Sequence, residues 1–205
     1  NFDDEKINYK PLDYHDYLFK SFEFSLNKKF YQNKTILISG AGGSVGMALT
    51  RELLKIDKIK LLLVDNSEFN LFKLKDAIKD FNNYQIYLLN ILDKKKISKV
   101  FDNQNIDVVI HAAAYKHVNI LQNQKYEAIE NNYLSTKILC DLSIDNKVKN
   151  FLFISTDKAV RPTSIMGVSK RLAEIYLQNK AHNNKNTKVS IVRFGNVLDS
   201  SGSVI

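Results

Sequence analysis

From Thr35 onward, short apolar runs alternate with longer segments of helical pattern, and this alternation restricts the possible folds more than any other feature of the chain. Such alternation is typical of repeated strand-helix-strand units that build a parallel sheet. The runs are continuously apolar, as in residues 61–64 and 108–110, which suits strands covered by helices on both faces. The sequence therefore predicts an α/β protein with an open, doubly wound parallel sheet.

The apolar runs and the helical spacing between them place the individual elements. We expect strands at residues 35–39, 60–65, 85–90, 107–111, 150–155 and 188–193. We expect helices at residues 44–56, 68–81, 94–103, 126–146 and 166–181.

The segment before residue 34 has a different pattern. It carries an apolar side chain at every fourth position, which predicts one helical stripe formed by Tyr14, Leu18, Phe22, Leu26 and Phe30. We expect this stripe to dock on the main domain or on a partner subunit. The chain is therefore divided into an N-terminal aromatic helical arm, residues 1–33, and a main domain, residues 34–205.

The composition is that of a globular chain rather than of a disordered or fibrous one. Of the 205 residues, 44% are hydrophobic and 25% are charged, and no apolar run approaches the ~18 residues that span a bilayer. The 30 basic and 22 acidic residues give a net charge of +8, but the lysines are scattered, so we expect no nucleic-acid partner. The single cysteine, Cys140, fits a reducing, cytoplasmic compartment, and we expect no metal site.

A glycine-rich segment, Gly-Ala-Gly-Gly-Ser-Val-Gly at residues 40–46, connects the first predicted strand to the first predicted helix. Strand, glycine loop and helix in this order bring bare backbone N–H groups and the positive end of a helix to one point, where a pyrophosphate can sit. The glycine spacing is Gly-x-x-Gly-x-x-Gly. We therefore predict a dinucleotide-binding Rossmann fold, and the residues expected to hold the phosphates are Gly40, Gly43, Ser44, Val45 and Gly46.

Asp65 indicates which dinucleotide is bound. It ends the second predicted strand, about 20 residues after the loop, where a carboxylate can accept hydrogen bonds from an adenosine ribose. A carboxylate there repels a 2′-phosphate, and no Arg follows it, so we predict NAD rather than NADP. Asp93, after the third strand, is expected at the adenine edge. Ala112, Ala113 and Ala114 supply small side chains where the cofactor lies close to the backbone.

Five segments, in their order along the chain, resemble a known family. They are the glycine loop at 40–46, His-Ala-Ala-Ala-Tyr-Lys-His-Val at 111–118, Ile-Ser-Thr-Asp-Lys-Ala-Val at 154–160, Met-Gly-Val-Ser-Lys-Arg at 166–171 and Arg-Phe-Gly-Asn-Val-Leu at 193–198. Together they resemble the nucleotide-sugar 4,6-dehydratases of the extended short-chain dehydrogenase/reductase superfamily. The resemblance is to the bacterial polysaccharide-biosynthesis and protein-glycosylation enzymes that act on UDP-N-acetylglucosamine.

The position four residues before Lys170 departs from the usual pattern of that superfamily. The superfamily normally has a Tyr there, which takes the proton from the substrate hydroxyl, whereas this chain has Met166. A thioether cannot act as a base, so the usual mechanism is excluded. The same Met is common in the long, membrane-anchored branch of the dehydratases, and it narrows the resemblance to that branch.

The resemblance also implies a reaction. Carbon 4 of the sugar loses a hydride to NAD as its hydroxyl loses a proton, water is then eliminated across carbons 5 and 6, and the hydride returns to carbon 6. Lys158 would be the base at carbon 5, since burial and a neighbouring cation can bring an amine near neutrality. Asp157 would protonate the leaving hydroxyl, and Thr156 would hold the carbon 4 hydroxyl. Asp157 or a water would take the proton that Tyr takes elsewhere, and Lys170 would bind the nicotinamide ribose.

The expected substrate contacts are Lys116, Arg193 and Asn196. Other interpretations stay open: the Thr-Asp-Lys run at 156–158 is also typical of a capping turn with the Lys in water. His111 ends a buried strand and is expected to be structural. The alternative functions are a UDP-sugar 4-epimerase, which expects Tyr at position 166, and a non-catalytic dinucleotide-binding module.

Members of the family continue well past the position that matches Ile205, and that part supplies a sugar-binding lobe. We therefore expect the C-terminal substrate lobe to be absent from this chain, and residues 1–205 alone to bind NAD weakly and to turn over little substrate. We expect a homo-oligomer and a cytoplasmic location. Any membrane attachment, at the inner face of the bacterial inner membrane, would come from a segment outside this chain.

Overall fold

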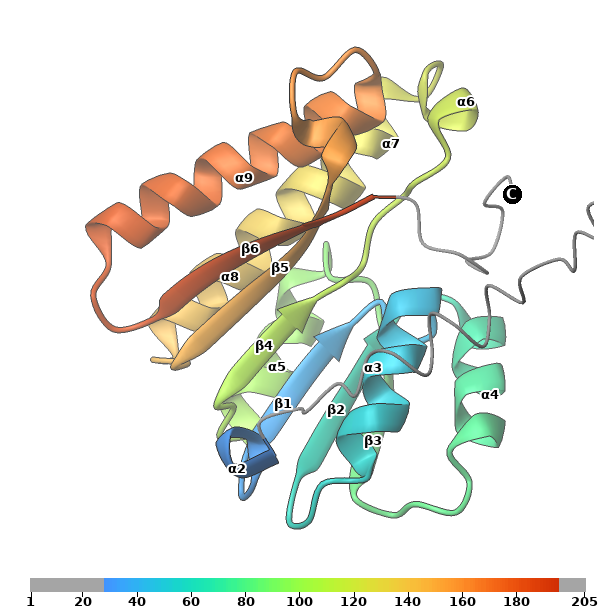
Figure 1. Ribbon diagram of the computed structural model, residues 1–205, viewed down its shortest axis with the longest axis vertical. Helices are drawn as coiled ribbons and strands as arrows, with labels where there is room; N and C mark the ends of the chain where they lie inside the picture. Colours follow the sequence, from blue (N-terminus) through green and yellow to red (C-terminus); the bar gives the residue numbers. More distant parts are fainter. Residues whose placement is uncertain (1–27, 196–205) are drawn as a thin grey trace, which may run out of the picture. The chain divides into compact units, whose positions relative to one another are not determined.

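The computed structural model describes residues 28–195. The chain divides into two units, residues 1–30 and 31–205, and the second contains a six-stranded parallel sheet with the order β3-β2-β1-β4-β5-β6 (Figure 1). The strand order reverses between β1 and β4, so the sheet is doubly wound, and the predicted α/β class is confirmed. The helical stripe of the N-terminal arm lies outside the described residues, apart from Phe30 in the short helix α2, Lys28–Tyr31.

The observed elements follow the predicted ones closely. The strands are β1 Thr35–Ser39, β2 Lys60–Asp65, β3 Tyr84–Leu88, β4 Val108–His111, β5 Asn150–Thr156 and β6 Lys188–Phe194. The longer helices are α3 Ser44–Leu54, α4 Glu68–Ala77, α5 Lys94–Asn103, α8 Ser135–Asp145 and α9 Ile165–Asn183. The shorter elements are α6 Val118–Leu121, α7 Lys125–Ile129, the π-helical turn η1 Glu130–Leu134 and the 3-10 turn η2 Asp157–Ala159. The predicted helix at 126–146 is thus interrupted by a π turn.

Serine side chains cap the beginnings of two helices. The hydroxyl oxygen of Ser67 accepts a hydrogen bond from the backbone N–H of Asn70 at 3.2 Å and begins α4. Ser164 does the same for Gly167 at 3.1 Å and begins α9. Such caps satisfy N–H groups that have no partner within the helix. The lysines at 94–96 are exposed in the first turn of α5, so this run is a solvated helix start.

The helices cover both faces of the sheet. α3 and α4 lie over β1, β2 and β3 on one face, and α5, α8 and α9 pack together over the other (Figure 1). The larger hydrophobic core lies between the sheet and this second set, and it includes Leu37, Val109, Phe151 and Phe153, all fully buried. Cys140 belongs to the same core, and burial raises the pKa of its thiol to about 12, so it acts as a small apolar side chain.

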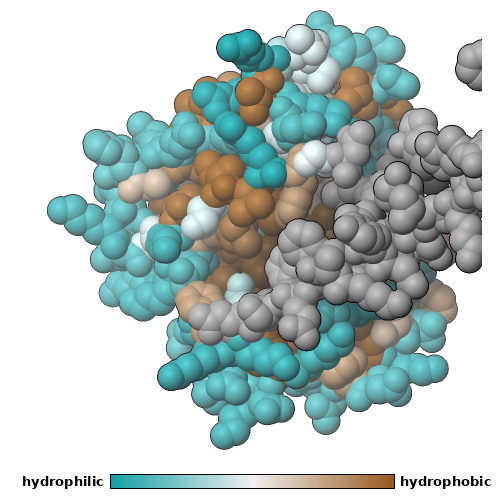
Figure 2. All heavy atoms as spheres, in the orientation of Figure 1, coloured by the Kyte–Doolittle hydropathy of each residue, from teal (hydrophilic) through white to brown (hydrophobic). Residues whose placement is uncertain are grey.

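Over β5 and β6, one face of the sheet carries no helix of the described residues. Side chains alternate along a strand, so Phe153 points into the core and Ile154 points to this open face. Val192 is paired with Ile154, and Phe194 with Thr156; both are about two-fifths exposed. Figure 2 shows apolar atoms gathered over these two strands. The open apolar surface therefore extends to Thr156, where β5 ends.

Candidate functional site

The glycine loop lies where β1 ends, beside the end of β4. Gly40 follows β1 with φ +68°, a left-handed conformation that favours glycine. A Cβ at Gly40 would lie 2.6 Å from the Cα and the backbone nitrogen of Ala113, and a Cβ at Gly46 would lie 2.1 Å from the carbonyl oxygen of Gly40. Glycine is required at both positions, because the loop brings the first turn of α3 against the ends of β1 and β4.

Asp65 faces this loop from the end of β2. Its Oδ2 accepts a hydrogen bond from the N–H of Gly42 at 3.0 Å, and its Oδ1 accepts one from the N–H of Ser67 at 2.9 Å. A carboxylate has about four lone-pair sites, so these bonds leave acceptor capacity for ribose hydroxyls. The N-cap residue of α3, Gly43, makes no side-chain cap, so phosphate oxygens can take the place of a cap at this helix start.

Asp93 and the three alanines follow β3 and β4, at the carboxyl edge of the sheet. Asp93 Oδ1 accepts a hydrogen bond from the backbone N–H of Lys96 at 3.1 Å, and this bond is the main reason that the pKa of Asp93 is lowered. Its carboxylate therefore caps α5, a structural role that the sequence analysis did not assign. Ala112 and Ala113 are partly buried, and Ala114 is exposed at the end of β4.

Thr156, Asp157 and Lys158 come together where β5 ends. The hydroxyl of Thr156 donates to Asp157 Oδ1 at 2.9 Å, and Lys158 Nζ lies 3.2 Å from the same oxygen. The hydrogen bond from Thr156 is the main reason that the pKa of Asp157 is lowered. Lys158 N–H donates to the Thr156 hydroxyl at 3.4 Å, so the segment is also a capping turn. The neighbour of the Lys158 amine is the carboxylate of Asp157 rather than the expected cation. The Lys158 side chain is 42% exposed.

Helix α9 carries Lys170 into the interior beside β5. Its Nζ donates to the carbonyl oxygen of Ile154 at 2.7 Å and lies 4.0 Å from the ring centroid of Phe153. The residue is only 4% exposed, and burial lowers its pKa to about 7. An amine with such a pKa can exchange a proton at physiological pH.

Two expected site residues have partners inside the protein. Met166 is 4% exposed and packs with Leu121 and Ala128 in a small apolar cluster, so the structure assigns it a packing role. Arg193 Nε and Nη2 donate to the two carboxylate oxygens of Glu174 at 2.8 and 2.7 Å. The guanidinium that we expected at the substrate is therefore committed to Glu174, which the sequence analysis missed although it lies one helical turn after Lys170.

Of the other expected substrate contacts, Lys116 is exposed after β4, and Asn196 lies outside the described residues. His111, expected to be structural, is fully buried, and burial lowers its pKa to about 3, so its ring is neutral.

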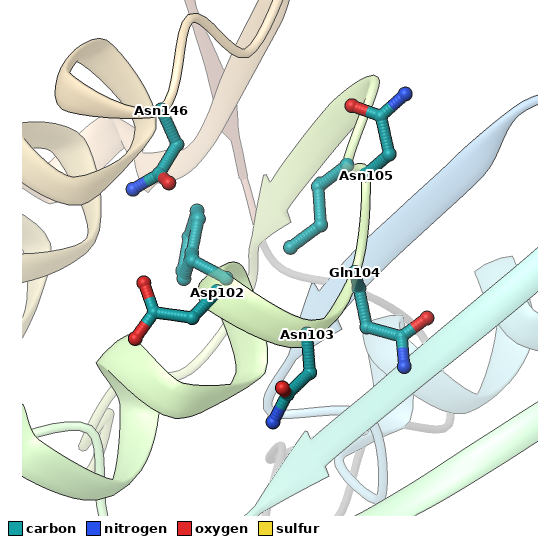
Figure 3. A pocket seen from close by; sticks show the side chains of 7 residues that line it. Asp102, Asn103, Gln104, Asn105 and Asn146 are labelled. Atoms are coloured by element: carbon teal, nitrogen blue, oxygen red, sulfur yellow. The ribbon is translucent and has the colours of Figure 1, made fainter.

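A polar hollow lies at the opposite edge of the sheet. Its lining side chains include Asn103, Gln104, Asn105 and Asn146, from the segment that enters β4 and from the end of α8 (Figure 3). Segments that enter parallel strands lie at the amino edge of a sheet, whereas nucleotide sites form at the carboxyl edge. The hollow is therefore separate from the glycine loop. Within residues 28–195, no three His, Cys, Asp or Glu side chains form a metal-binding group, and no helix is long and apolar enough to cross a membrane.

The chain matches the model of a family described as polysaccharide biosynthesis protein over residues 36–205. It is 36% identical to a capsular polysaccharide biosynthesis protein of Staphylococcus aureus, over 98% of this chain and 35% of that protein. It is 33% identical to a UDP-N-acetylglucosamine 4,6-dehydratase (inverting) of Campylobacter jejuni, over 85% of this chain and 52% of that protein. It is 35% identical to a UDP-glucose 4-epimerase of Rickettsia massiliae, with the same two coverages.

Among solved structures, Pen from Bacillus thuringiensis has a TM-score of 0.80 to this chain at 30% identity, covering 85% of this chain and 54% of that one. The chain thus spans about half, or less, of the length of the relatives it matches. The family model covers most of the chain, and the doubly wound sheet with its glycine loop agrees with the match. The chain therefore belongs to the polysaccharide biosynthesis protein family, among the nucleotide-sugar dehydratases and epimerases of the extended short-chain dehydrogenase/reductase superfamily.

Proposed function

We propose that the full-length protein is an NAD-dependent UDP-N-acetylhexosamine 4,6-dehydratase, and that residues 34–205 form its cofactor-binding and catalytic domain. The observation that carries this proposal is the cluster of Thr156, Asp157 and Lys158 at the end of β5, with a hydroxyl and an amine within 3.2 Å of one carboxylate oxygen. Elimination of water needs a base and an acid at neighbouring carbons, and this cluster holds both kinds of group. Reversible hydride transfer at carbon 4 alone needs only a base for the hydroxyl proton.

The described residues fit NAD. A glycine with φ +68°, a helix start without a side-chain cap and a carboxylate with spare lone pairs meet at one loop. The phosphates would lie at residues 40–46, the adenosine ribose at Asp65, and the nicotinamide side near residues 112–114 and Lys170. When bound, NAD would accept a hydride from the sugar and later return it. The carboxylate of Asp65 would disfavour a 2′-phosphate by charge repulsion.

The remaining chemistry consists of proton transfers by the chain. The lowered pKa keeps Asp157 ionised in the free protein, so it can take the proton of the carbon 4 hydroxyl through the hydroxyl of Thr156. Lys158 would act as a neutral amine: it would remove the proton from carbon 5 and return it there when the hydride returns to carbon 6. Asp157 then returns its proton to the hydroxyl that leaves carbon 6, so that one water departs. Met166 takes no part in these transfers.

The test is the mass of the product that the full-length protein forms from UDP-N-acetylglucosamine. We expect a product lighter by one water, and we expect Asp157→Asn and Lys158→Ala to abolish it. Glu52→Gln, which alters an exposed ion pair with Lys55, is the control and should keep full activity. Dehydration that persists in both site variants would refute the assignment of the cluster.

A UDP-sugar 4-epimerase is the second candidate, because several relatives carry the name UDP-glucose 4-epimerase. It would give a product of unchanged mass. A non-catalytic dinucleotide-binding module would bind NAD and convert no UDP-sugar. A homo-oligomeric state and a location at the cytoplasmic face of the inner membrane are further parts of the proposal, to be checked by light scattering and by fractionation of cells that make the full-length protein.

A further inference from the structure

Five buried polar residues are connected by hydrogen bonds that the proposed reaction does not use, and one of these bonds is made by the backbone carbonyl of Asn132; we call this network the buried relay. Its members, each 0% exposed, are Ser39, His111, Thr136, Asn132 and Ser169. Ser39 Oγ lies 2.6 Å from His111 Nδ1, and His111 Nε2 lies 2.9 Å from Thr136 Oγ1. Thr136 Oγ1 donates to the backbone carbonyl oxygen of Asn132 at 2.7 Å, and the side-chain Nδ2 of Asn132 donates to Ser169 Oγ at 3.0 Å.

The direction of the bonds follows from the groups that take part. The hydroxyl hydrogen of Thr136 goes to the Asn132 carbonyl, so the Thr136 oxygen accepts from His111 Nε2–H. His111 Nδ1 then carries no hydrogen and accepts from the Ser39 hydroxyl. This series ends on a backbone carbonyl, which cannot pass a proton on. The relay therefore holds parts of the protein in position and does not conduct protons.

Asn132 is also hydrogen-bonded to the segment that follows β4. Its Oδ1 accepts from the N–H of Tyr115 at 2.8 Å, and its Nδ2 donates to the carbonyl oxygen of Tyr115 at 3.0 Å. The side-chain amide of Asn132 thus binds both the N–H and the carbonyl of Tyr115. Asn132 lies in the π turn η1, and such turns occur frequently at functional sites.

The members of the buried relay precede three parts of the proposed site in the chain. Ser39 precedes Gly40, His111 precedes Ala112, and Ser169 precedes Lys170. We propose that the buried relay sets the glycine loop and residues 112–115 at a fixed position relative to α9 and Lys170, so that His111, Thr136 and Asn132 are positioning residues for the reaction. A shift of any element would leave buried polar groups unpaired, which is costly. This inference rests on the proposed function, because it assumes that Gly40 and Lys170 serve one reaction.

The test compares three substitutions on α8 in the full-length protein. Thr136→Val keeps the shape of the side chain and removes the hydroxyl, whereas Thr136→Ser keeps the hydroxyl. Ser143→Ala is the matched control, because Ser143 is 0% exposed on the same helix and its hydroxyl donates to the Leu139 carbonyl at 2.6 Å, outside the relay. We expect Thr136→Val to lower kcat by roughly ten- to a hundredfold, since small misplacements at an active site have effects of this size. Thr136→Ser and Ser143→Ala should stay near the wild-type kcat.

A purely structural role would lower the melting temperature in Thr136→Val and Ser143→Ala and leave kcat unchanged in both, and that result would overturn the proposal. Hydrogen–deuterium exchange provides a readout that needs no turnover. We expect Thr136→Val to raise exchange at residues 39–43 and at 166–171 together, whereas Ser143→Ala should raise it only around α8. Exchange confined to α8 in both variants would also refute the relay.

Ser169→Ala is a milder variant for the case that Thr136→Val yields little folded protein. It removes the last link of the relay, and we expect it to raise exchange in the segment around Tyr115 and to lower kcat; unchanged values in both measurements would count against the proposal. If the wild-type protein does not dehydrate the UDP-sugar, the proposed function fails. The exchange experiment still decides whether the relay couples the two segments.

Discussion

Replacing Glu174 by Gln is the most direct test of the electrostatics beside the site. Its carboxylate is fully buried and accepts from Ser155 Oγ at 2.7 Å, from Arg171 at 3.0 Å and from Arg193 at 2.7 and 2.8 Å. Burial acts to raise the pKa of Glu174, but the hydrogen bonds from Arg193, Ser155 and Arg171 outweigh it and lower the pKa from 4.5 to about 2.

The size of the expected effect follows from this pKa. A pKa of about 2 in place of 4.5 corresponds to about 3 kcal/mol, because each pH unit of difference is worth ~1.36 kcal/mol. We expect Glu174→Gln to lower the free energy of unfolding at pH 7 by about 3 kcal/mol, since an amide cannot pair with the guanidinium of Arg193 as a carboxylate does. A carboxylate with a lowered pKa stabilises the fold fully above its unfolded pKa and loses this effect as the pH falls toward the folded pKa. At pH 3 the difference should therefore shrink to about 1.4 kcal/mol.

The assay is urea unfolding followed by circular dichroism, for both proteins at pH 7 and at pH 3. Glu52→Gln is the control, because Glu52 pairs with Lys55 at 2.7 Å while its side chain is 55% exposed. An exposed pair contributes ~0–1 kcal/mol, so this variant should change little. Equal effects of the two substitutions, or an effect of Glu174→Gln that is the same at both pH values, would refute the reasoning.

Three further predictions concern the cofactor side and Lys170. Gly40→Ala places a Cβ 2.6 Å from the Ala113 backbone at φ +68°, and we expect it to cost at least about 1–2 kcal/mol in urea unfolding and to abolish NAD binding. A wild-type midpoint would contradict this. The pKa of Lys170 is about 7 when folded and 10.5 when unfolded, so the unfolded chain binds more protons between these values and stability should rise with pH from 7 to 10. Lys170→Met should lack that rise. If the stability of both proteins changes with pH in parallel, the rise does not come from Lys170. Asp65→Asn removes the charge that repels a 2′-phosphate, so the preference for NAD over NADP should narrow in fluorescence titrations of the full-length protein; an unchanged ratio of dissociation constants would speak against this role.

The sequence alone was sufficient for the positions of most elements and for the place of the glycine loop. The bounds of β1, β2 and α5 agree with the predicted residues, because apolar runs and helical spacing are local properties of the chain. The position of Asp65 at the end of β2 followed from the same pattern. The structure adds that its carboxylate is bonded to the loop it was expected to serve.

Tertiary structure alone decided the partners of the charged and buried polar groups. Arg193 pairs with Glu174, 19 residues away in the chain, and His111 bonds to Thr136, 25 residues away. No spacing rule of helices or strands brings such pairs together, since they meet only after the strand order and the packing of α8 and α9 on the sheet are established. The burial of Lys170 has the same origin: a lysine on a helix has no local reason to lie inside, and it does so because α9 packs against β5.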